Sequence, residues 1–385
     1  MKRIFLPVVL ALALVPAAQA QKKVLDHSVY DDWQSLSNAA ISPKGQVISY
    51  QVNPQEGDGT LYLRTLGKKG GECQVERGYK LQLSADEAYA VCLIKAPYAQ
   101  TRQARIDKKK PDQMPKDSLA VIDLKTFRTV KYPDVKDYKM GKYAREYFAF
   151  STTDTSFVPR QDRKAKDKGT PLAVYHFASG RLDTLQNIGN YAFSEDGEQL
   201  ALVRNIGKNK AVAGFYSQGE AHFLTDTCAW VGLPVFDQDG ARALFLQATD
   251  TLDSGSKHPK LYLYDTASRE RILLIGENPG PKVPEGWGLT ENSRLLFSHD
   301  GKRILAGIQA FEPPKDTTLV PFETPGLDIW NWDAPTLPPH DKLMLKEERT
   351  RTFLAVVKDG ALIPLQTRPL ARLNGGDRWD APIAL

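Results

Sequence analysis

Cysteine and histidine are scarce in this sequence, which has three cysteines and six histidines among 385 residues. The histidines stand singly, and neither H-E-x-x-H nor another ligand spacing occurs. Cys73 and Cys92 lie 19 residues apart, which does not match the short spacing of a zinc site. We therefore expect no metal and no cofactor. Each histidine is expected on the surface or in a strand: His27, His176, His222, His258, His299 and His340.

An odd number of cysteines permits at most one disulfide within the chain. Cys73 and Cys92 lie in neighbouring candidate strands and could pair. The alternative is that they are buried as small apolar side chains.

Long apolar runs are missing after the first 20 residues, which read MKRIFLPVVLALALVPAAQA. Lys2 and Arg3 precede an apolar run from Ile4 to Ala17, and Ala18-Gln19-Ala20 is a small-x-small cleavage site, the layout of a secretory signal peptide. The run is too short for a membrane span. We expect a signal peptide at 1–20, cleavage near Ala20, and an exported, periplasmic or extracellular protein of residues 21–385 that does not span the membrane.

An excess of one charge is also missing, since Lys and Arg number 51 and Asp and Glu number 46. Removal of Lys2 and Arg3 lowers the formal net charge from +5 to +3. The basic clusters at 108–110 and 160–168 are interrupted or flanked by acids and contain no interleaved aromatic residues. We interpret them as solvated loops and expect no nucleic-acid partner.

The sequence contains one motif, here called the repeated phrase, in five copies, one of which is YAFSEDGEQLALV at 191–203. In each copy a Ser or Asp begins a polar turn, usually with Gly, between two runs of alternating apolar residues. Such alternation predicts strands, and Gly provides the positive φ of a tight hairpin turn. The turns begin at Ser42, Ser84, Ser194, Asp237 and Ser298. KMGKYAREYFAFS at 139–151, with a turn near Gly141, fills the one long gap and makes six copies.

A second hairpin follows most copies, as in LAVIDLKTFRTVKY at 119–132 and LYLYDTASRERILL at 261–274. Two hairpins make four strands in each unit of about 40–60 residues, which is typical of a β-propeller blade. The prediction is an all-β propeller with about six visible blades in an incomplete ring, in preference to a β-solenoid or tandem sandwiches. A helix is expected only within 340–352.

The insertions lie between the two hairpins of a blade, at 101–118, 159–171, 249–260 and 311–342. Because strands of a blade alternate in direction, these loops are expected on one rim. The last contains GLDIWNWDAP, and its Trp330 and Trp332 have two interpretations. They anchor the loop onto the blade, or they form an aromatic contact surface for a partner domain or a peptide.

The sequence contains no motif that identifies a catalytic serine. A nucleophile elbow requires G-x-S-x-G, and no serine has Gly at both −2 and +2. Ser217 comes nearest, but Phe215 occupies its −2 position, and we expect it to be a polar turn residue.

With the blades placed, the chain resembles the amino-terminal propeller of an exported serine peptidase of the prolyl oligopeptidase family. Four stretches carry the resemblance: VLDHSVYDDWQSLSNAAISPKGQVISYQV, QTRQARIDKKKPDQMPKDSLAVIDL, LDIWNWDAP and RTRTFLAVV. It implies a Ser–Asp–His triad on an α/β-hydrolase domain that follows the propeller, which caps the active site. No triad position has a counterpart here, so no catalytic residue is assigned.

Relatives have seven or eight blades, and RLNGGDRWDAPIAL at 372–385 resembles the start of another inner strand. We therefore expect a fragment: a non-catalytic module that controls peptide access and docks its own hydrolase domain. The alternative is a stand-alone periplasmic propeller of the TolB type that binds a protein or cell-envelope partner. A third option, a sugar-active enzyme, requires carboxylates that face each other in the channel.

The family also offers a role for Glu347 and Glu348, as an acidic pair that holds a peptide amino terminus. The competing interpretation is a solvated helix in which they form ion pairs with Lys346 and Arg349.

Overall fold

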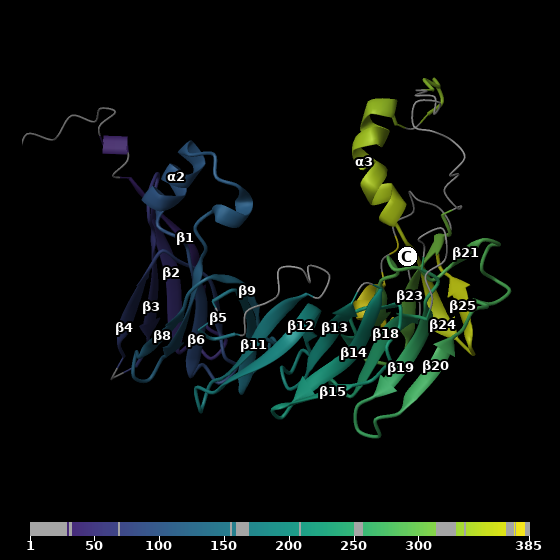
Figure 1. Cartoon of the computed structure of the whole chain (residues 1–385), viewed down its shortest axis with the longest axis horizontal. Helices are drawn as coiled ribbons and strands as arrows, with labels where there is room; N and C mark the ends of the chain where they lie inside the picture. Colours follow the sequence, from purple (N-terminus) through teal and green to yellow (C-terminus); the bar gives the residue numbers. More distant parts are fainter. Residues whose placement is uncertain are drawn as a thin grey trace, which may run out of the picture. The chain divides into compact units, whose positions relative to one another are not determined.

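A computed structural model describes residues 29–30, 33–67, 70–154, 156–158, 169–207, 209–249, 257–312, 329–334, 336–366, 373 and 375–381. The predicted signal peptide and the basic cluster at 160–168 lie outside these residues. The chain divides into two compact units (Figure 1). Unit 1 comprises Met1–Tyr79 and Pro97–Met114, and unit 2 comprises Lys80–Ala96 and Pro115–Leu385.

Unit 1 contains one four-stranded antiparallel sheet in the order β1-β2-β3-β4. Its strands are β1 (Gln34–Ile41), β2 (Val47–Pro54), β3 (Thr60–Thr65) and β4 (Glu72–Glu76). Alternate side chains of β2 and β3 are buried, with Val47, Leu61 and Leu63 at most 2% exposed. The alternation places one face of the sheet in a core, as the sequence predicts.

The insertion at 101–118 was expected to be a loop, and this expectation is wrong. It contributes most of helix α2 (Tyr98–Ile106), followed by the 3-10 turn η3 (Pro111–Gln113). The helix sequence YAQTRQARI has no Gly or Pro and is rich in Ala, Gln and Arg, which favour helices. Asp58 Oδ1 accepts the first backbone N–H of α2, from Tyr98 at 2.9 Å. The basic residues 108–110 that follow are exposed, as predicted.

Unit 2 opens with a second four-stranded sheet in the order β5-β6-β7-β8. Its strands are β5 (Gly78–Leu83), whose first two residues belong to unit 1, β6 (Tyr89–Ile94), β7 (Ser118–Asp123) and β8 (Thr129–Tyr132). Cys92 is fully buried on β6, and Cys228 is buried too, as small apolar side chains. Cys73 on β4 is half-buried.

Two blades form one continuous seven-stranded sheet. Its strands are β9 (Val135–Lys139), β10 (Tyr147–Thr152), β11 (Thr170–His176), β12 (Leu182–Phe193), β13 (Leu200–Gly207), β14 (Lys210–Ser217) and β15 (Glu220–Phe223). The first half of β12 pairs with β11 and its second half pairs with β13. The pairing partner of β12 changes from β11 to β13 beside Asn187, whose φ is +62°. The register with β13 shifts between Ile188 and Asn190. The outer strand of one blade therefore continues into the inner strand of the next.

In the last two blades the inner strand is split into two short pieces that pair with the same neighbour. One blade contains β16 (Trp230–Val231), β17 (Val235–Phe236), β18 (Arg242–Ala248), β19 (Lys260–Asp265) and β20 (Arg271–Ile275). The other contains β21 (Trp287–Gly288), β22 (Leu295–Phe297), β23 (Ile304–Ala310), β24 (Phe353–Lys358) and β25 (Ala361–Pro364). Figure 1 labels the strands of these blades. The described residues thus form six blades, which confirms the predicted propeller architecture.

Neighbouring blades of unit 2 bury their faces against each other. Ala201, Ala213 and Phe215 from one blade form a cluster with Ala243 and Phe245 from the next. A second cluster joins the two blades that follow. This packing explains the repetition, because a blade buries its apolar faces only against its neighbours.

The repeated turns follow the predicted chemistry. In four of them the Ser oxygen accepts the backbone N–H five residues on, at 2.9–3.0 Å, and Asp237 does so at 3.1 Å in the fifth. The glycines have positive φ, as in Gly45 and Gly301, and Glu87 takes the glycine's place in the second copy with φ +61°.

The expectation that 372–385 begins another strand is wrong for the described residues of that segment. Gly376–Trp379 forms the 3-10 turn η6. The segment contacts the turn that begins at Ser298. The carbonyl oxygen of Arg378 accepts a hydrogen bond from the backbone N–H of His299 at 3.1 Å. The carbonyl oxygen of Trp379 accepts one from Arg303 Nη1 at 2.6 Å. These bonds tie the segment to an existing turn, and Gly375 forms a single β-bridge in place of an extended strand.

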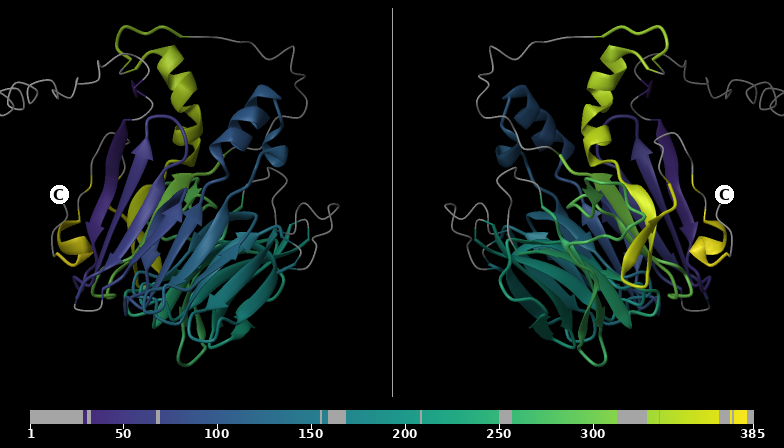
Figure 2. Two further views of the ribbon diagram at one scale, coloured as in Figure 1. Left: turned by 90° about the vertical axis from the view of Figure 1, so that its left-hand side faces the viewer. Right: turned by 90° about the vertical axis from the view of Figure 1, so that its right-hand side faces the viewer.

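The helix expected within 340–352 is present as α3 (Pro338–Thr350). None of its residues is buried, and Figure 2 shows it projecting beyond the strands of unit 2. Among the described helices, none combines the length and apolar character that a membrane span requires.

Candidate functional site

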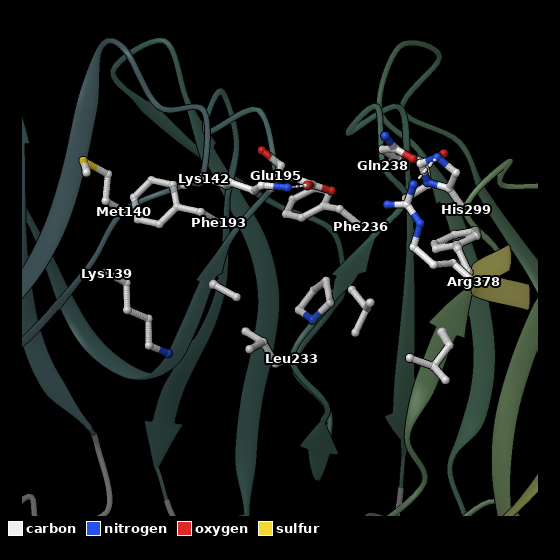
Figure 3. Close-up of a pocket in the computed structure, with 18 of the residues that line it drawn as sticks. Lys139, Met140, Lys142, Phe193, Glu195, Leu233, Phe236, Gln238, His299 and Arg378 are labelled. Atoms are coloured by element: carbon white, nitrogen blue, oxygen red, sulfur yellow. Dashed lines mark hydrogen bonds and ion pairs between the residues drawn. The ribbon is translucent and has the colours of Figure 1, made fainter. Parts of the chain in front are cut away.

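A cavity of about 870 Å³ lies within unit 2, where the inner strands of its five blades converge (Figure 3). Strands β5, β9, β12, β17 and β22, with the residues that follow them, each contribute to its wall, and η6 adds Arg378 and Trp379. These inner strands are the ones that the repeated phrase encodes.

The wall combines apolar and charged side chains. The apolar part includes Met140, Phe193, Leu233, Phe236 and Phe297. Most of these residues are only partly buried, so they present apolar surface to the cavity. Such a wall suits a flexible ligand with apolar groups better than a small ion.

Three carboxylates line the cavity, and each is paired with a cation. Asp137 pairs with Lys80, Glu195 pairs with Lys142 at 2.7 Å, and the buried Asp237 pairs with Arg242 at 2.9 Å. These pairings leave little support for a sugar-active enzyme, which requires one carboxylate free to act as an acid.

Lys139, at the end of β9, has a different environment. Its ammonium donates to the backbone carbonyl of Tyr191 at 2.7 Å and lies 4.5 Å from the centre of the Tyr191 ring. Burial lowers the pKa of Lys139 because the charged form loses solvation; Asp137 opposes this shift and Lys80 adds to it.

A second polar cluster joins two blades of the seven-stranded sheet. Asp183 Oδ2 lies 3.0 Å from His176 Nε2 and 2.7 Å from Arg181 Nη2, and it accepts the hydroxyl of Tyr216. Burial favours the neutral acid, but hydrogen bonds from Tyr216, His176 and Arg181 hold the pKa of Asp183 below its usual value. Burial raises the pKa of Tyr216 well above its usual value. The bonds tie the two blades together.

Sequence reasoning missed this cluster because it treated each histidine alone. His176 and Asp183 lie near the ends of two paired strands, β11 and β12, so the hairpin pattern contained a signal for their contact. Tyr216 is 40 residues further along, and only the order of strands in the sheet brings it close.

The structure does not bring Trp330 or Trp332 to the cavity wall. Their side chains are 65% and 94% exposed, and neighbouring Ile329 is 72% exposed. Whether they contact a partner or a peptide stays a prediction.

Glu348 forms an ion pair with Arg351, which directly follows α3, and not with the predicted Lys346 or Arg349. No residue of α3 is buried, which favours the solvated-helix interpretation. Ser217 ends β14 at the turn through Gln218 and Gly219, both with positive φ, as expected of a turn residue. No group of three His, Cys, Asp or Glu side chains suited to a metal occurs among the described residues.

No protein-family model matches this sequence, and no curated protein matches it. Similar solved structures include a prolyl endopeptidase, with 12% identity, coverage of 90% of this chain and 45% of that chain, and a TM-score of 0.42. The β-propeller domain of the trilobed protease from Pyrococcus furiosus has 12% identity, coverage of 88% and 85%, and a TM-score of 0.37. TolB from Acinetobacter baumannii has 15% identity, coverage of 62% and 53%, and a TM-score of 0.28.

This chain thus spans less than half of the length of the prolyl endopeptidase. Because all three TM-scores lie below 0.5, the assignment of the fold rests on the blades described above.

Proposed function

We propose that this chain is the non-catalytic propeller module of an exported serine peptidase, which admits peptides through the unit 2 cavity and docks a hydrolase domain. The observation that carries the proposal is the cavity, which is bounded by the inner strands of five blades. Its volume of about 870 Å³ lies within the range of small-ligand sites and suits a few extended residues, not a folded protein.

Two features of the sequence support the peptidase part of the proposal. The ordered stretches quoted above resemble the propeller of the prolyl oligopeptidase family. No serine has the glycines of a nucleophile elbow, so the chemistry falls to another domain. The export part of the proposal is supported by residues 1–20, which have the layout of a secretory signal peptide.

The proposal is tested with the purified 385-residue chain. Anisotropy of dye-labelled octapeptides is expected to show saturable binding, and acyl-proline or aminoacyl reporter substrates are expected to stay intact. Gln238, an exposed residue at the cavity wall, provides a blocking variant, Gln238→Trp, which is expected to weaken binding at least about fivefold because the indole fills the space. The matched control is Gln113→Trp, at an exposed position of unit 1. Hydrolysis, or binding that Gln238→Trp leaves unchanged, would contradict the proposal.

A stand-alone exported propeller that binds a protein or cell-envelope partner is the second candidate. The observation in its favour is the exposure of the apolar side chains of Ile329, Trp330 and Trp332, which precede α3 in the chain, and of Leu343 within α3, which is 82% exposed. Under this alternative, Trp332→Ser abolishes capture of the partner while the cavity variant Gln238→Trp has no effect.

A further inference from the structure

The cavity wall carries more unneutralised positive than negative charge. Four cations line it, and two of these, Lys80 and Lys142, are paired with carboxylates of the same wall. The third carboxylate, Asp237, is paired with Arg242. Lys139 and Arg378 therefore remain as cations that form no ion pair with a carboxylate among the described residues.

Lys139 is the better placed of the two to meet a ligand. Figure 3 shows its side chain extending into the cavity between the Met140 and Leu233 sides of the wall. The carbonyl of Tyr191 accepts one of the three ammonium hydrogens, and two donors stay available. The ammonium is also partly desolvated by the surrounding wall, so an ionic hydrogen bond there is stronger than one in open solvent.

Arg378 extends the positive potential to another part of the wall. Its Nη2 lies 2.8 Å from Nε2 of His299, an imidazole nitrogen and not a carboxylate. Its backbone is held by the bond from His299 N to Arg378 O at 3.1 Å. An anionic ligand is therefore attracted from either part of the wall.

We infer that the cavity selects peptides that carry a carboxylate, and that the ammonium of Lys139 receives this carboxylate. The inference rests on the proposed function, because it names the class of peptide that the same cavity admits. The carboxylate has two sources, the peptide carboxyl terminus and an Asp or Glu side chain. Both offer the same acceptor oxygens to Lys139.

The test uses four labelled octapeptides of one apolar sequence that differ only in two features. One feature is a central Asp or Asn, and the other is a free or amidated carboxyl terminus. Each is titrated into the full chain at pH 7 and low salt. We expect the doubly neutral peptide to bind at least about tenfold more weakly than the best acidic peptide, since a charged hydrogen bond typically contributes more than one factor of ten. The two peptides that each lack one carboxylate show whether Lys139 binds the Asp side chain or the carboxyl terminus.

Three variants complete the test. Lys139→Met is expected to remove the preference for acidic peptides. Lys139→Arg is expected to retain this preference, and it tests the role of the positive charge even if Lys139→Met folds poorly. Lys136→Met is the matched control, because Lys136 lies on the same strand, is exposed and does not line the cavity. Equal binding of all four peptides overturns the inference and leaves the proposed function standing. Absence of binding by every peptide overturns both.

Discussion

Gly141 and Gly197 lie so close together that a Cβ on Gly141 would be 2.4 Å from the Cα of Gly197. Gly141 belongs to the turn between β9 and β10, and Gly197 to the turn before β13, where its φ is +78°. The two blades therefore meet backbone to backbone beside the cavity. The sequence contained both glycines in the repeated phrase, but it indicated only their role in the turn.

Gly197→Ala is expected to destabilise unit 2 by about 2–4 kcal/mol, because the added methyl combines backbone strain with a clash. At Gly197 a Cβ would lie 2.5 Å from the Cα of Ala144. Gly360→Ala is the matched control, since Gly360 has φ +75° and open space around the added atom. Gly360→Ala is expected to lower the free energy of unfolding by about 1 kcal/mol. Thermal unfolding of both variants measures the difference in stability. Equal destabilisation by the two substitutions would show that the close backbone contact at Gly197 does not contribute to it.

Ser194→Ala is expected to cost about 1–3 kcal/mol, because it leaves partly buried backbone groups of Gln199 without their partner. Ser194 is 1% exposed, and its Oγ accepts the N–H of Gln199 at 3.0 Å. Ser179→Ala removes a comparable bond to Arg181 in an exposed turn and is expected to change stability little. If chemical denaturation gives the same midpoint for both variants, the account of the repeated turns is wrong.

Asp183→Asn is expected to lower stability at pH 7 by about 1–3 kcal/mol, since the charged acceptor of three hydrogen bonds is lost. The pKa of Asp183 is lowered in the folded state, so its stabilisation is present above the unfolded pKa, ordinarily near 4, and is lost as the pH falls through the folded value. The difference between the variant and the parent chain is therefore expected to shrink in acid. A difference that stays constant from pH 7 to pH 3 would contradict this assignment.

Binding of an acidic peptide is expected to weaken on the alkaline side at a lower pH than an ordinary lysine would produce. The reason is that burial lowers the pKa of Lys139, so its positive charge is lost earlier as the pH rises. Titrations from pH 7 to pH 10 with the parent chain and with Lys139→Arg separate this effect, because arginine stays charged throughout. Identical profiles for the two proteins would contradict the role of Lys139.

We predict that the chain is exported and that signal-peptide cleavage leaves an amino terminus near Gln21. Intact-mass measurement of protein recovered from the secreted or periplasmic fraction reads this directly. A product that retains Lys2 and Arg3 in that fraction would contradict the signal peptide.

The sequence predicted most of the fold because its signals are local. Alternating apolar residues, turn glycines and the period of about 40–60 residues identified six blades and the turn oxygens of Ser42 and Ser298. Helix α2 was missed because its charged sequence lacks an apolar periodicity and depends on its propensity and on Asp58.

The site was less accessible to sequence reasoning because it is assembled from distant residues. Lys139 and Tyr191 are 52 residues apart, and each looked like an ordinary strand residue. Only the order of the inner strands brings Lys139 to the carbonyl of Tyr191 and places Lys139 and Phe236 on the wall of one cavity. Trp330 and Trp332 were conspicuous in the sequence, but they are not among the residues that line that cavity.

The measurement that tests the central claim most directly is photo-crosslinking of an octapeptide to the full chain, followed by mass spectrometry of the crosslinked residues. Our account predicts crosslinks on the inner strands, at Lys139, Phe193 or Phe236, with the peptide backbone uncut. Crosslinks confined to Trp330, Trp332 and α3, or a cleaved peptide, would contradict it.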